Sequence, residues 1–447
     1  MAQARLGGSV GFVVADARTG QVLEARNAGV ALPPASVTKA VTALYAIDAL
    51  GADYRFQTQF VATGPVVDGI VQGDLVLTGS GDPMLDTDAL SAMVARLKAK
   101  GVTGVSGRFR VFAGALPYIR SIDPRQPDHV GYNPSISGTN LNFNRVYFQW
   151  QRGDAGWNVS MDARSKTIRP AVTVSRMAVV NRDLPTYTYS AAKGVDEWTV
   201  AAAALGNGGS RWLPVRRPDL YVGEVTQVIA RGHGIRLPAP EVADGAAGGQ
   251  VLVRHESASL ATIVRLMLKH STNLTAEVIG LTASAARGAP AGDLVASAKA
   301  MTDWMRAETG AEAAHFVDHS GLSDLSRVSA GDMVKLLVKV GPGSTLHGQL
   351  KEIAPLDMRG EKVSGAGYRI HAKTGSLNFV SSLAGYLTGP GDAALAFAIL
   401  SGDTERRADI APDDMERPDG ARSWAKRARW LQHQFIHRWS SLYSAGL

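Results

Sequence analysis

The stretch that most constrains the fold is Pro33–Lys39, with the sequence PPASVTK. The two prolines favour an extended segment and hinder a helix before Pro34. From Val37 to Leu50 apolar residues recur at three- and four-residue steps, the spacing of one helix face. The sequence therefore predicts an extended segment that turns into a largely apolar helix, with Ser36 at or near its first turn.

The same stretch places a hydroxyl beside an amine. Lys39 follows Ser36 by three residues, so it projects from the same helix face one turn later. A neutral amine there can remove the hydroxyl proton and activate a serine nucleophile, and backbone N–H groups at the helix start can face an oxyanion. A second Ser-x-x-Lys at Ser423–Lys426 falls inside a predicted helix, away from its N-terminus, so we discard it.

The composition sets limits on size and chemistry. The chain has 447 residues, of which 45% are hydrophobic, enough for two or three domains. We expect no membrane-spanning helix, because no run reaches about 18 apolar residues. Cysteine is absent, which excludes disulfides, thiolate catalysis and cysteine metal sites. The net charge of +7 would suit an acidic polymer, but the basic residues are mostly scattered, and without a nucleic-acid motif we expect no nucleic-acid partner.

The order of predicted elements indicates an insertion. Ser9–Asp16 and Gln21–Ala25 read as a strand hairpin that leads into the Ser36 helix. Short Val-rich runs, broken by Gly and Pro, then predict mainly β structure in which only Asp88–Lys100 reads as helical. These Val-rich runs are residues 69–78, 102–112, 171–180 and 220–229. We therefore expect one domain from residues 1–72 and 255–447, interrupted by residues 73–254, with a nested subdomain near 150–230.

Two further polar stretches flank predicted helices. Ser271 and Asn273 lie between a helix that ends at His270 and one that begins near Thr275, where side chains can point into a cleft. The alternative is ordinary helix–helix turn chemistry. His315 and His319 share a spacing but lack a His-Glu-x-x-His pattern, so we expect no metal site, and no other motif indicates a cofactor.

The last third of the chain predicts a sheet and a terminal helix. Tyr368–Thr374, Val380–Leu387 and Ala394–Leu400 read as strands. Lys373-Thr374-Gly375 at the end of the first would place an ammonium, a hydroxyl and a close backbone approach on one edge, unless it is an ordinary strand end with a solvated lysine. Ala421–Tyr443 is an amphipathic helix that we expect to dock on its own sheet, with contact to a membrane surface as the alternative.

Three motifs now stand in order: Ser36-x-x-Lys39, Ser271-x-Asn273 and Lys373-Thr374-Gly375. This is the trio of the penicillin-recognising serine enzymes. The chain resembles that superfamily, and more narrowly its class C low-molecular-mass penicillin-binding proteins, which are D-alanyl-D-alanine carboxypeptidases and endopeptidases. Phrases at residues 34–39, 73–83, 273–277, 320–323 and 373–377 carry the narrower match. The resemblance covers nearly the whole chain and implies an α+β fold, a β-lactamase/transpeptidase-like antiparallel sheet flanked by helices, with a large mainly β insert.

The resemblance also implies how the reaction is divided among residues. Ser36 would attack the carbonyl of the penultimate D-alanine and form an acyl-enzyme, with Lys39 as its base. Ser271 would relay a proton to the leaving amine, and Asn273 would hold the substrate amide and Lys39. Lys39 must then be substantially neutral, which burial and a second cation, Lys373, would favour by lowering its pKa.

The substrate-binding residues follow from the same resemblance. Lys373 and Thr374 would bind the terminal carboxylate, and Gly375 would allow the backbone to approach closely. Ser376 stands where threonine is commoner, and its backbone N–H would complete the oxyanion hole with that of Ser36.

The chain departs from the family pattern Asp-Gly-Ser-Gly-Leu-Ser-Arg. His319 replaces its glycine, and Asp324 stands where the family has an arginine associated with the diaminopimelate side chain of the substrate. Arg327 could substitute for that arginine in a different register. Asp128, near Tyr132, corresponds loosely to an acidic residue of the family insert.

The resemblance implies a periplasmic enzyme that acts on peptidoglycan peptides and is acylated by β-lactam antibiotics. Met1–Gly8 has no apolar signal-peptide core, so either the leader has been removed or the protein is cytosolic. One alternative is a serine β-lactamase, but the Glu-x-x-Leu-Asn pattern that would support it is absent from the sequence. The other is a non-catalytic peptidoglycan-binding protein. The sequence does not indicate an oligomeric state.

Overall fold

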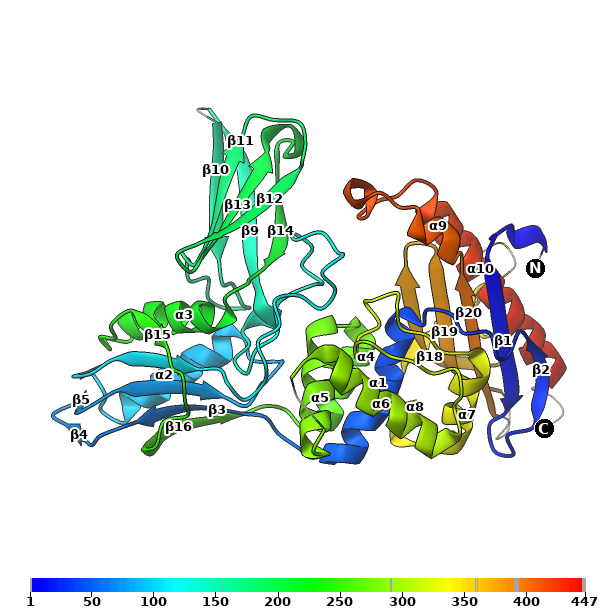
Figure 1. Cartoon of the computed structure of the whole chain (residues 1–447), viewed down its shortest axis with the longest axis horizontal. Helices are drawn as coiled ribbons and strands as arrows, with labels where there is room; N and C mark the ends of the chain where they lie inside the picture. The colour runs from blue at the N-terminus through cyan, green and yellow to red at the C-terminus, as the bar shows by residue number, and fades with distance from the viewer. Residues whose placement is uncertain are drawn as a thin grey trace. The chain divides into compact units, whose positions relative to one another are not determined.

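The computed structural model describes residues 2–154, 156–289, 292–357, 359, 361–389 and 394–443. The chain forms two compact units. One, here called the sheet unit, contains the residues up to Ala52 and those from Ala261 onward; the other, the inserted unit, contains Asp53–Leu260. An α+β fold is confirmed, because helices cover antiparallel strands in the sheet unit (Figure 1).

The sheet unit is built on one sheet with the strand order β17-β18-β19-β20-β1-β2. Every neighbouring pair is antiparallel, and the N-terminal strand β1 pairs with the C-terminal strand β20 along its full length. The strands are β1 (Ser9–Asp16), β2 (Val22–Arg26), β17 (Lys351–Ile353), β18 (Arg369–Leu377), β19 (Val380–Thr388) and β20 (Ala394–Gly402). The predicted hairpin and the three predicted C-terminal strands therefore belong to one sheet.

Helices cover both faces of this sheet. Leu383 and Leu387 share a hydrophobic cluster with Trp424 of α10, whereas the hydroxyl of Tyr386 donates to the carbonyl of Leu337 in α7. Alternate residues of β19 thus face opposite helices. The helices are α1 (Thr38–Leu50), α4 (Leu260–His270), α5 (Asn273–Ala286), α6 (Leu294–Thr309), α7 (Ala330–Val340), α8 (Thr345–Gln349), α9 (Thr404–Ala408) and α10 (Ala421–Tyr443). The terminal helix docks on its own sheet, as the sequence predicted (Figure 1).

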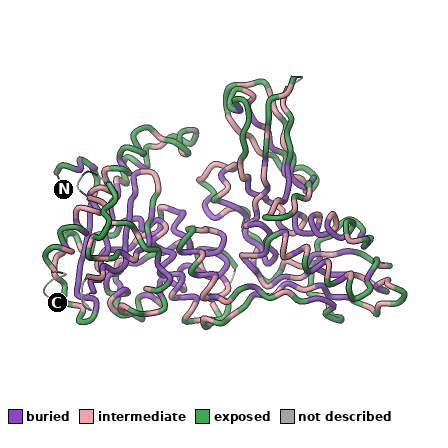
Figure 2. The backbone as a smooth tube through the Cα atoms, turned by 180° about the vertical axis from the view of Figure 1, so that it is seen from behind, coloured by how far each residue is buried: buried purple, intermediate pink, exposed green. Residues whose placement is uncertain are grey.

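The central strands of the sheet, β1 and β20, are almost completely buried. All nine residues of β20 are buried, as are seven of the eight in β1 (Figure 2). A strand buried on both faces has no polar side and reads as a continuous apolar run. This explains why the sequences ALAFAIL in β20 and GFVVA in β1 show no alternation.

The described residues of the inserted unit form four smaller sheets and two α-helices. Its five-stranded sheet has the order β15-β8-β6-β3-β16, and the three others are β10-β9-β14, β11-β13-β12 and β4-β5-β7. The strands are β3 (Gln57–Ala62), β4 (Val66–Val67), β5 (Ile70–Val71), β6 (Leu75–Gly79), β7 (Gly104–Val105), β8 (Phe109–Phe112), β9 (Arg145–Gly153), β10 (Gly156–Asp162), β11 (Ser175–Val180), β12 (Tyr187–Ala192), β13 (Val195–Ala201), β14 (Gly208–Pro214), β15 (Pro240–Val242) and β16 (Gln250–Glu256). The helices are α2 (Thr87–Ala99) and α3 (Pro218–Gly232).

The structure differs from the sequence prediction at two places in this unit. The run at residues 220–229, interpreted as β material, is helix α3. Its buried residues Tyr221, Val222, Val225 and Ile229 follow helical spacing, and Pro218 stands in the first turn, where proline is favoured. The unit also begins at Asp53 rather than near residue 73, because β3 pairs with β6 and β16 inside it.

Among the described residues, no helix is both long enough and apolar enough to cross a membrane.

Candidate active site

Ser36 lies on a 3-10 turn, Ala35–Val37, that leads directly into α1. Ala35 has a φ of 48°, a left-handed conformation that is strained for a residue with a side chain. Strand β18 approaches this turn so closely that a Cβ on Gly375 would lie 2.5 Å from the carbonyl oxygen of Pro34 and 3.0 Å from the nitrogen of Ser36. Glycine at this position is therefore what allows β18 to lie against the backbone of Ser36.

The amine of Lys39 joins Ser36 to two distant segments. Lys39 Nζ lies 2.9 Å from Ser36 Oγ, 2.7 Å from Asn273 Oδ1 and 2.7 Å from the carbonyl oxygen of Ser320. All three are acceptors, so they satisfy the three donors of an ammonium group. The structure thus brings together Ser36, Lys39 and Asn273, which the sequence had predicted, and adds Ser320, which it had not.

The burial of Lys39 affects its protonation. The residue is 0% exposed, and burial lowers the pKa of its amine to about 8, against the opposing charges of Glu277 and Asp318. A pKa near 8 leaves roughly a tenth of the amines neutral at pH 7. Of the two causes that the sequence analysis named, burial and Lys373, burial is the one that lowers this pKa.

A second lysine stands beside the other predicted serine. Lys373 Nζ donates to Ser271 Oγ at 3.0 Å and to the carbonyl oxygen of Thr374 at 2.7 Å. Its pKa is lowered well below the usual value by burial, then by the charges of Lys39 and Lys351. Ser271, with a φ of 57°, is another left-handed non-glycine residue, in the turn between α4 and α5. Two hydroxyl–amine pairs thus occupy the sheet unit.

The remaining predicted residues divide into two groups. Thr374 and Ser376 are exposed on β18, on either side of buried Gly375, so their side chains can meet a ligand. Arg327 instead donates to the carbonyl oxygens of Asp324 and Ser326 in its own loop. Asp128 belongs to the inserted unit, where Oδ1 accepts from Arg120 Nη2 at 2.9 Å. The side chain of Asp324, at the position of the family arginine, pairs with Arg407 Nε at 2.7 Å.

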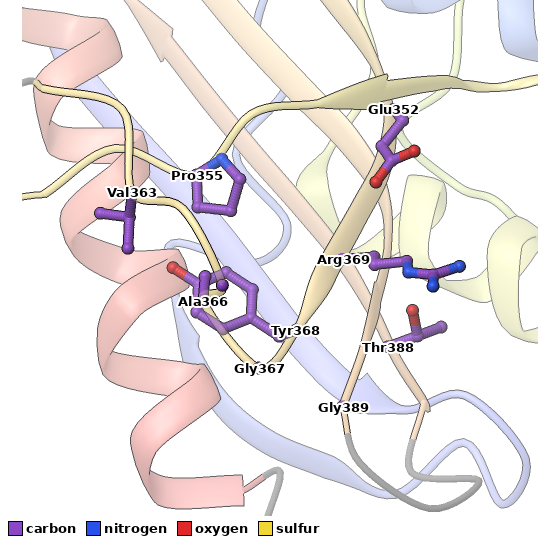
Figure 3. Close-up of a pocket in the computed structure, with 10 residues that line it drawn as sticks. Glu352, Pro355, Val363, Ala366, Gly367, Tyr368, Arg369, Thr388 and Gly389 are labelled. Carbon is purple, nitrogen blue, oxygen red and sulfur yellow. The ribbon is translucent and has the colours of Figure 1, made fainter.

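A separate pocket of about 660 Å³ opens at the other end of β18 (Figure 3). Glu352, Arg369 and Thr388 line one side of it, and Tyr368 and Val363 contribute elsewhere to the lining. Ser36, Lys39 and Lys373 are not among its lining residues. This pocket is therefore not the site of the two hydroxyl–amine pairs, which we identify by their hydrogen bonds.

A model of the D-Ala-D-Ala carboxypeptidase 3 (S13) family matches residues 1–418. The chain belongs to this family. It is thus a serine-type D-Ala-D-Ala carboxypeptidase, a hydrolase, and one of the penicillin-recognising serine enzymes.

Relatives match this carboxypeptidase over most of their length. The D-alanyl-D-alanine carboxypeptidase of Actinomadura sp. (strain R39) is 28% identical over 92% of this chain and 83% of its own. Penicillin binding protein 4 of Haemophilus influenzae superimposes with a TM-score of 0.75 at 19% identity, over 97% of this chain and 98% of its own, and its complex with a β-lactam gives 0.72. A predatory peptidoglycan endopeptidase of Bdellovibrio bacteriovorus gives 0.52 at 15% identity, over 98% and 94%. These structural matches support the fold of the carboxypeptidase.

Sequence reasoning missed the residues beneath Lys39. Glu277 is fully buried, and its carboxylate accepts from the backbone N–H groups of His319 and Ser320, each at 2.9 Å. The signal was present in the sequence, because Glu277 follows Asn273 by four residues and so lies on the same helix face one turn later. The sequence alone could not show which loop that face would meet.

Proposed function

We propose that Ser36 is the nucleophile of this carboxypeptidase and Lys39 its general base. The observation that supports this most is the 2.9 Å contact between Ser36 Oγ and Lys39 Nζ, an amine whose burial lowers its pKa to about 8. A buried lysine with a lowered pKa is a known kind of general base.

The acylation step then proceeds as follows. Lys39 Nζ takes the proton of Ser36 Oγ, and Oγ forms a bond to the carbonyl carbon of the penultimate D-alanine. The C–N bond to the terminal D-alanine breaks, and Ser271, which Lys373 contacts, relays the proton that Lys39 took from Ser36 to the leaving amine, so that Lys39 is neutral again. Backbone N–H groups of Ser36 and Ser376 stabilise the oxyanion. Water then hydrolyses the acyl-enzyme and frees Ser36.

The binding roles are proposals as well. Asn273 holds Lys39 and the substrate amide, and the amino group of Lys373 with the hydroxyl of Thr374 binds the terminal carboxylate. Asp128 and Arg327 stay predictions for recognition of the third residue of the stem peptide.

We infer further that the enzyme acts in the periplasm on peptidoglycan peptides, is acylated by β-lactams, and also cleaves D-alanyl cross-links. The family assignment supports a cell-wall substrate, and the fold shared with a peptidoglycan endopeptidase is compatible with cross-link cleavage. A purified cross-linked muropeptide dimer tests the last point, because cleavage would release monomers with the same Ser36 dependence as D-alanine release.

Intact-mass spectrometry after brief exposure to benzylpenicillin tests the nucleophile. We expect a stable one-to-one adduct on the native chain and none on Ser36→Ala. Ser423→Ala, in the second Ser-x-x-Lys, is a matched control that keeps the adduct, because this exposed hydroxyl donates to the carbonyl oxygen of Gly420, the residue before α10, at 2.9 Å.

Three other outcomes would contradict the proposal. Rapid loss of penicillin without an adduct would favour a β-lactamase, and intact penicillin without an adduct would favour a non-catalytic protein. An adduct that survives Ser36→Ala would assign the nucleophile elsewhere.

A further inference from the structure

The third hydrogen-bond acceptor of Lys39 comes from a loop that two carboxylates hold. The peptide group between Ser320 and Gly321 offers its carbonyl oxygen to Lys39 Nζ at 2.7 Å, and its N–H donates to Asp318 Oδ1 at 2.7 Å. The preceding two N–H groups, of His319 and Ser320, donate to Glu277 Oε2 and Oε1. Each successive N–H from residue 319 to 321 is thus bound to a buried carboxylate.

Glu277 brings this loop to the same helix that supplies another contact to Lys39. Asn273, which contacts Lys39 Nζ directly at 2.7 Å, and Glu277 are one turn apart on α5. The first turns of α5 therefore position two of the three acceptors of the amine, Asn273 Oδ1 and the carbonyl oxygen of Ser320. A shift of Glu277 would move the Ser320 carbonyl relative to Asn273.

The fit between α5 and the loop is tight at the position where this chain departs from its family. A Cβ on Gly280 would lie 2.2 Å from the ring of His319, so the glycine in α5 makes room for the larger loop residue. His319 Nε2 lies 2.7 Å from Ser297 Oγ, and its ring stacks on that of Tyr45. Burial lowers the pKa of His319 to about 3, so the ring is neutral at pH 7. The loop is thus held by the packing of the His319 ring as well as by its hydrogen bonds to the Glu277 carboxylate.

The charged groups that act on Glu277 include Lys39, the proposed general base. Asp318 from the loop and Lys39 from α1 both act on it, and Lys373 on β18 in turn interacts with Lys39. Burial, followed by the charge of Asp318, raises the pKa of Glu277, whereas the hydrogen bonds from Ser320 and His319 and the charge of Lys39 lower it. In its ionised form the carboxylate favours the ammonium form of Lys39. Removing that charge would make Lys39 easier to deprotonate.

We propose that Glu277 is a positioning residue for the base: it fixes the Ser320 carbonyl that, together with Asn273, aims the amine of Lys39 at Ser36, and its charge helps to set when Lys39 is neutral. This inference rests on the proposed function. In this role Glu277 acts through Lys39 and does not contact the substrate.

Two substitutions separate geometry from charge. Glu277→Gln removes the charge and leaves one backbone N–H facing an amide NH2 group. Glu277→Asp keeps the charge but shortens the side chain by one methylene. The control is Asp332→Asn, because Asp332 is another buried carboxylate that accepts two successive loop N–H groups, from Glu312 at 3.2 Å and Ala313 at 2.9 Å, and has no part in the proposed chemistry.

The measurement is the second-order rate of acylation by benzylpenicillin as a function of pH, with kcat and KM for a D-alanyl-D-alanine peptide. We expect the native rate to rise through about pH 8 as Lys39 loses its proton. Both Glu277 variants should acylate about ten- to a hundredfold more slowly, with kcat affected more than KM, since the base is misplaced. The midpoint should fall by about one pH unit in Glu277→Gln and stay in place in Glu277→Asp.

The outcomes distinguish this inference from the function on which it rests. A native chain that forms no adduct overturns the proposed function. A native chain that forms one, with both Glu277 variants matching its rate and midpoint, overturns the role of Glu277. A midpoint shift of equal size in Asp332→Asn would also overturn it, because any lost buried carboxylate would then suffice. If Glu277→Gln does not fold, the rate of Glu277→Asp decides, since a native rate contradicts the positioning role.

Discussion

A buried cation in each unit of the molecule lies against a set of hydrogen-bond acceptors, Lys39 in one unit and Arg216 in the other, and the two sets differ. In the sheet unit Lys39, 0% exposed, contacts a hydroxyl, a side-chain amide and one carbonyl oxygen. In the inserted unit the guanidinium of Arg216, 2% exposed, donates to the backbone carbonyl oxygens of Arg120, Asn133 and Asp128 at 2.8 to 2.9 Å, and its Nη2 also lies 3.8 Å from Asp128 Oδ1.

The difference follows from the chemistry of the two side chains. A guanidinium stays charged in a protein, so Arg216 is always a hydrogen-bond donor to the loop that it binds and cannot act as a base. An ammonium loses its proton when burial lowers its pKa far enough, so Lys39 can alternate between donor and base. Burial of a cation therefore indicates chemistry only when the cation can be neutral and a reactive hydroxyl is among its partners.

The largest expected effect is that of Lys39→Arg. The guanidinium cannot become neutral, so the general base is lost, and acylation by benzylpenicillin should slow by about 10²- to 10⁴-fold. Timed intact-mass spectra measure this rate. Lys426→Arg, in the exposed second copy of the motif, should leave it unchanged. Acylation of Lys39→Arg at the native rate would remove the contrast between the two cations.

Arg216→Met should act on stability instead. Three carbonyl oxygens, in one buried and two partly buried hydrogen bonds, lose their donor, which should lower the free energy of unfolding by about 2 kcal/mol. Denaturant unfolding measures this loss, and the acylation rate of the folded protein should stay native. The adjacent Arg217 is half-exposed and paired with Asp219, so Arg217→Met should cost about 0–1 kcal/mol. A folded Arg216→Met protein that no longer acylates would mean that this cation, too, serves the chemistry.

Gly375→Ala tests the approach of β18 to Ser36. The added methyl would meet the Pro34 carbonyl and the Ser36 nitrogen, so the strand must retreat, and acylation should slow by about tenfold. Gly348→Ala in α8 is the control, because a Cβ there meets nothing within 4 Å. Acylation kinetics of both variants give the result, and equal rates would show that the close approach is not needed.

Asp128→Asn should have the smallest effect. If Asp128 recognises a charged side chain of the stem peptide, KM for that peptide should rise by about fivefold or less, the worth of an exposed ion pair, with acylation by benzylpenicillin unchanged. Asp244→Asn, another exposed carboxylate of the inserted unit, should leave KM unchanged. A native KM in Asp128→Asn would remove Asp128 from the substrate-binding set.

Parts of the fold were predictable because their signals are local. The helix after Ser36 and strands β18 to β20 lie where the hydrophobic spacing placed them. Helix α3 was predicted wrongly because the β propensity of its valines outweighed the three- and four-residue spacing of its buried residues. Helix α6 was overlooked, although Leu294, Ala298, Met301 and Met305 repeat at helical spacing after the N-cap Asp293.

By itself, the sequence determined the pairs that backbone geometry fixes over a few residues. Ser36 and Lys39 are neighbours because they stand three residues apart at the start of a helix, and Lys373, Thr374 and Gly375 are neighbours on one strand. Only the tertiary structure decided what meets Lys39 from farther away: Asn273 is 234 residues distant and Ser320 is 281. Such contacts depend on the packing of α5, the Ser320 loop and β18 around α1, which is the joint result of many side chains and cannot be read from any single stretch.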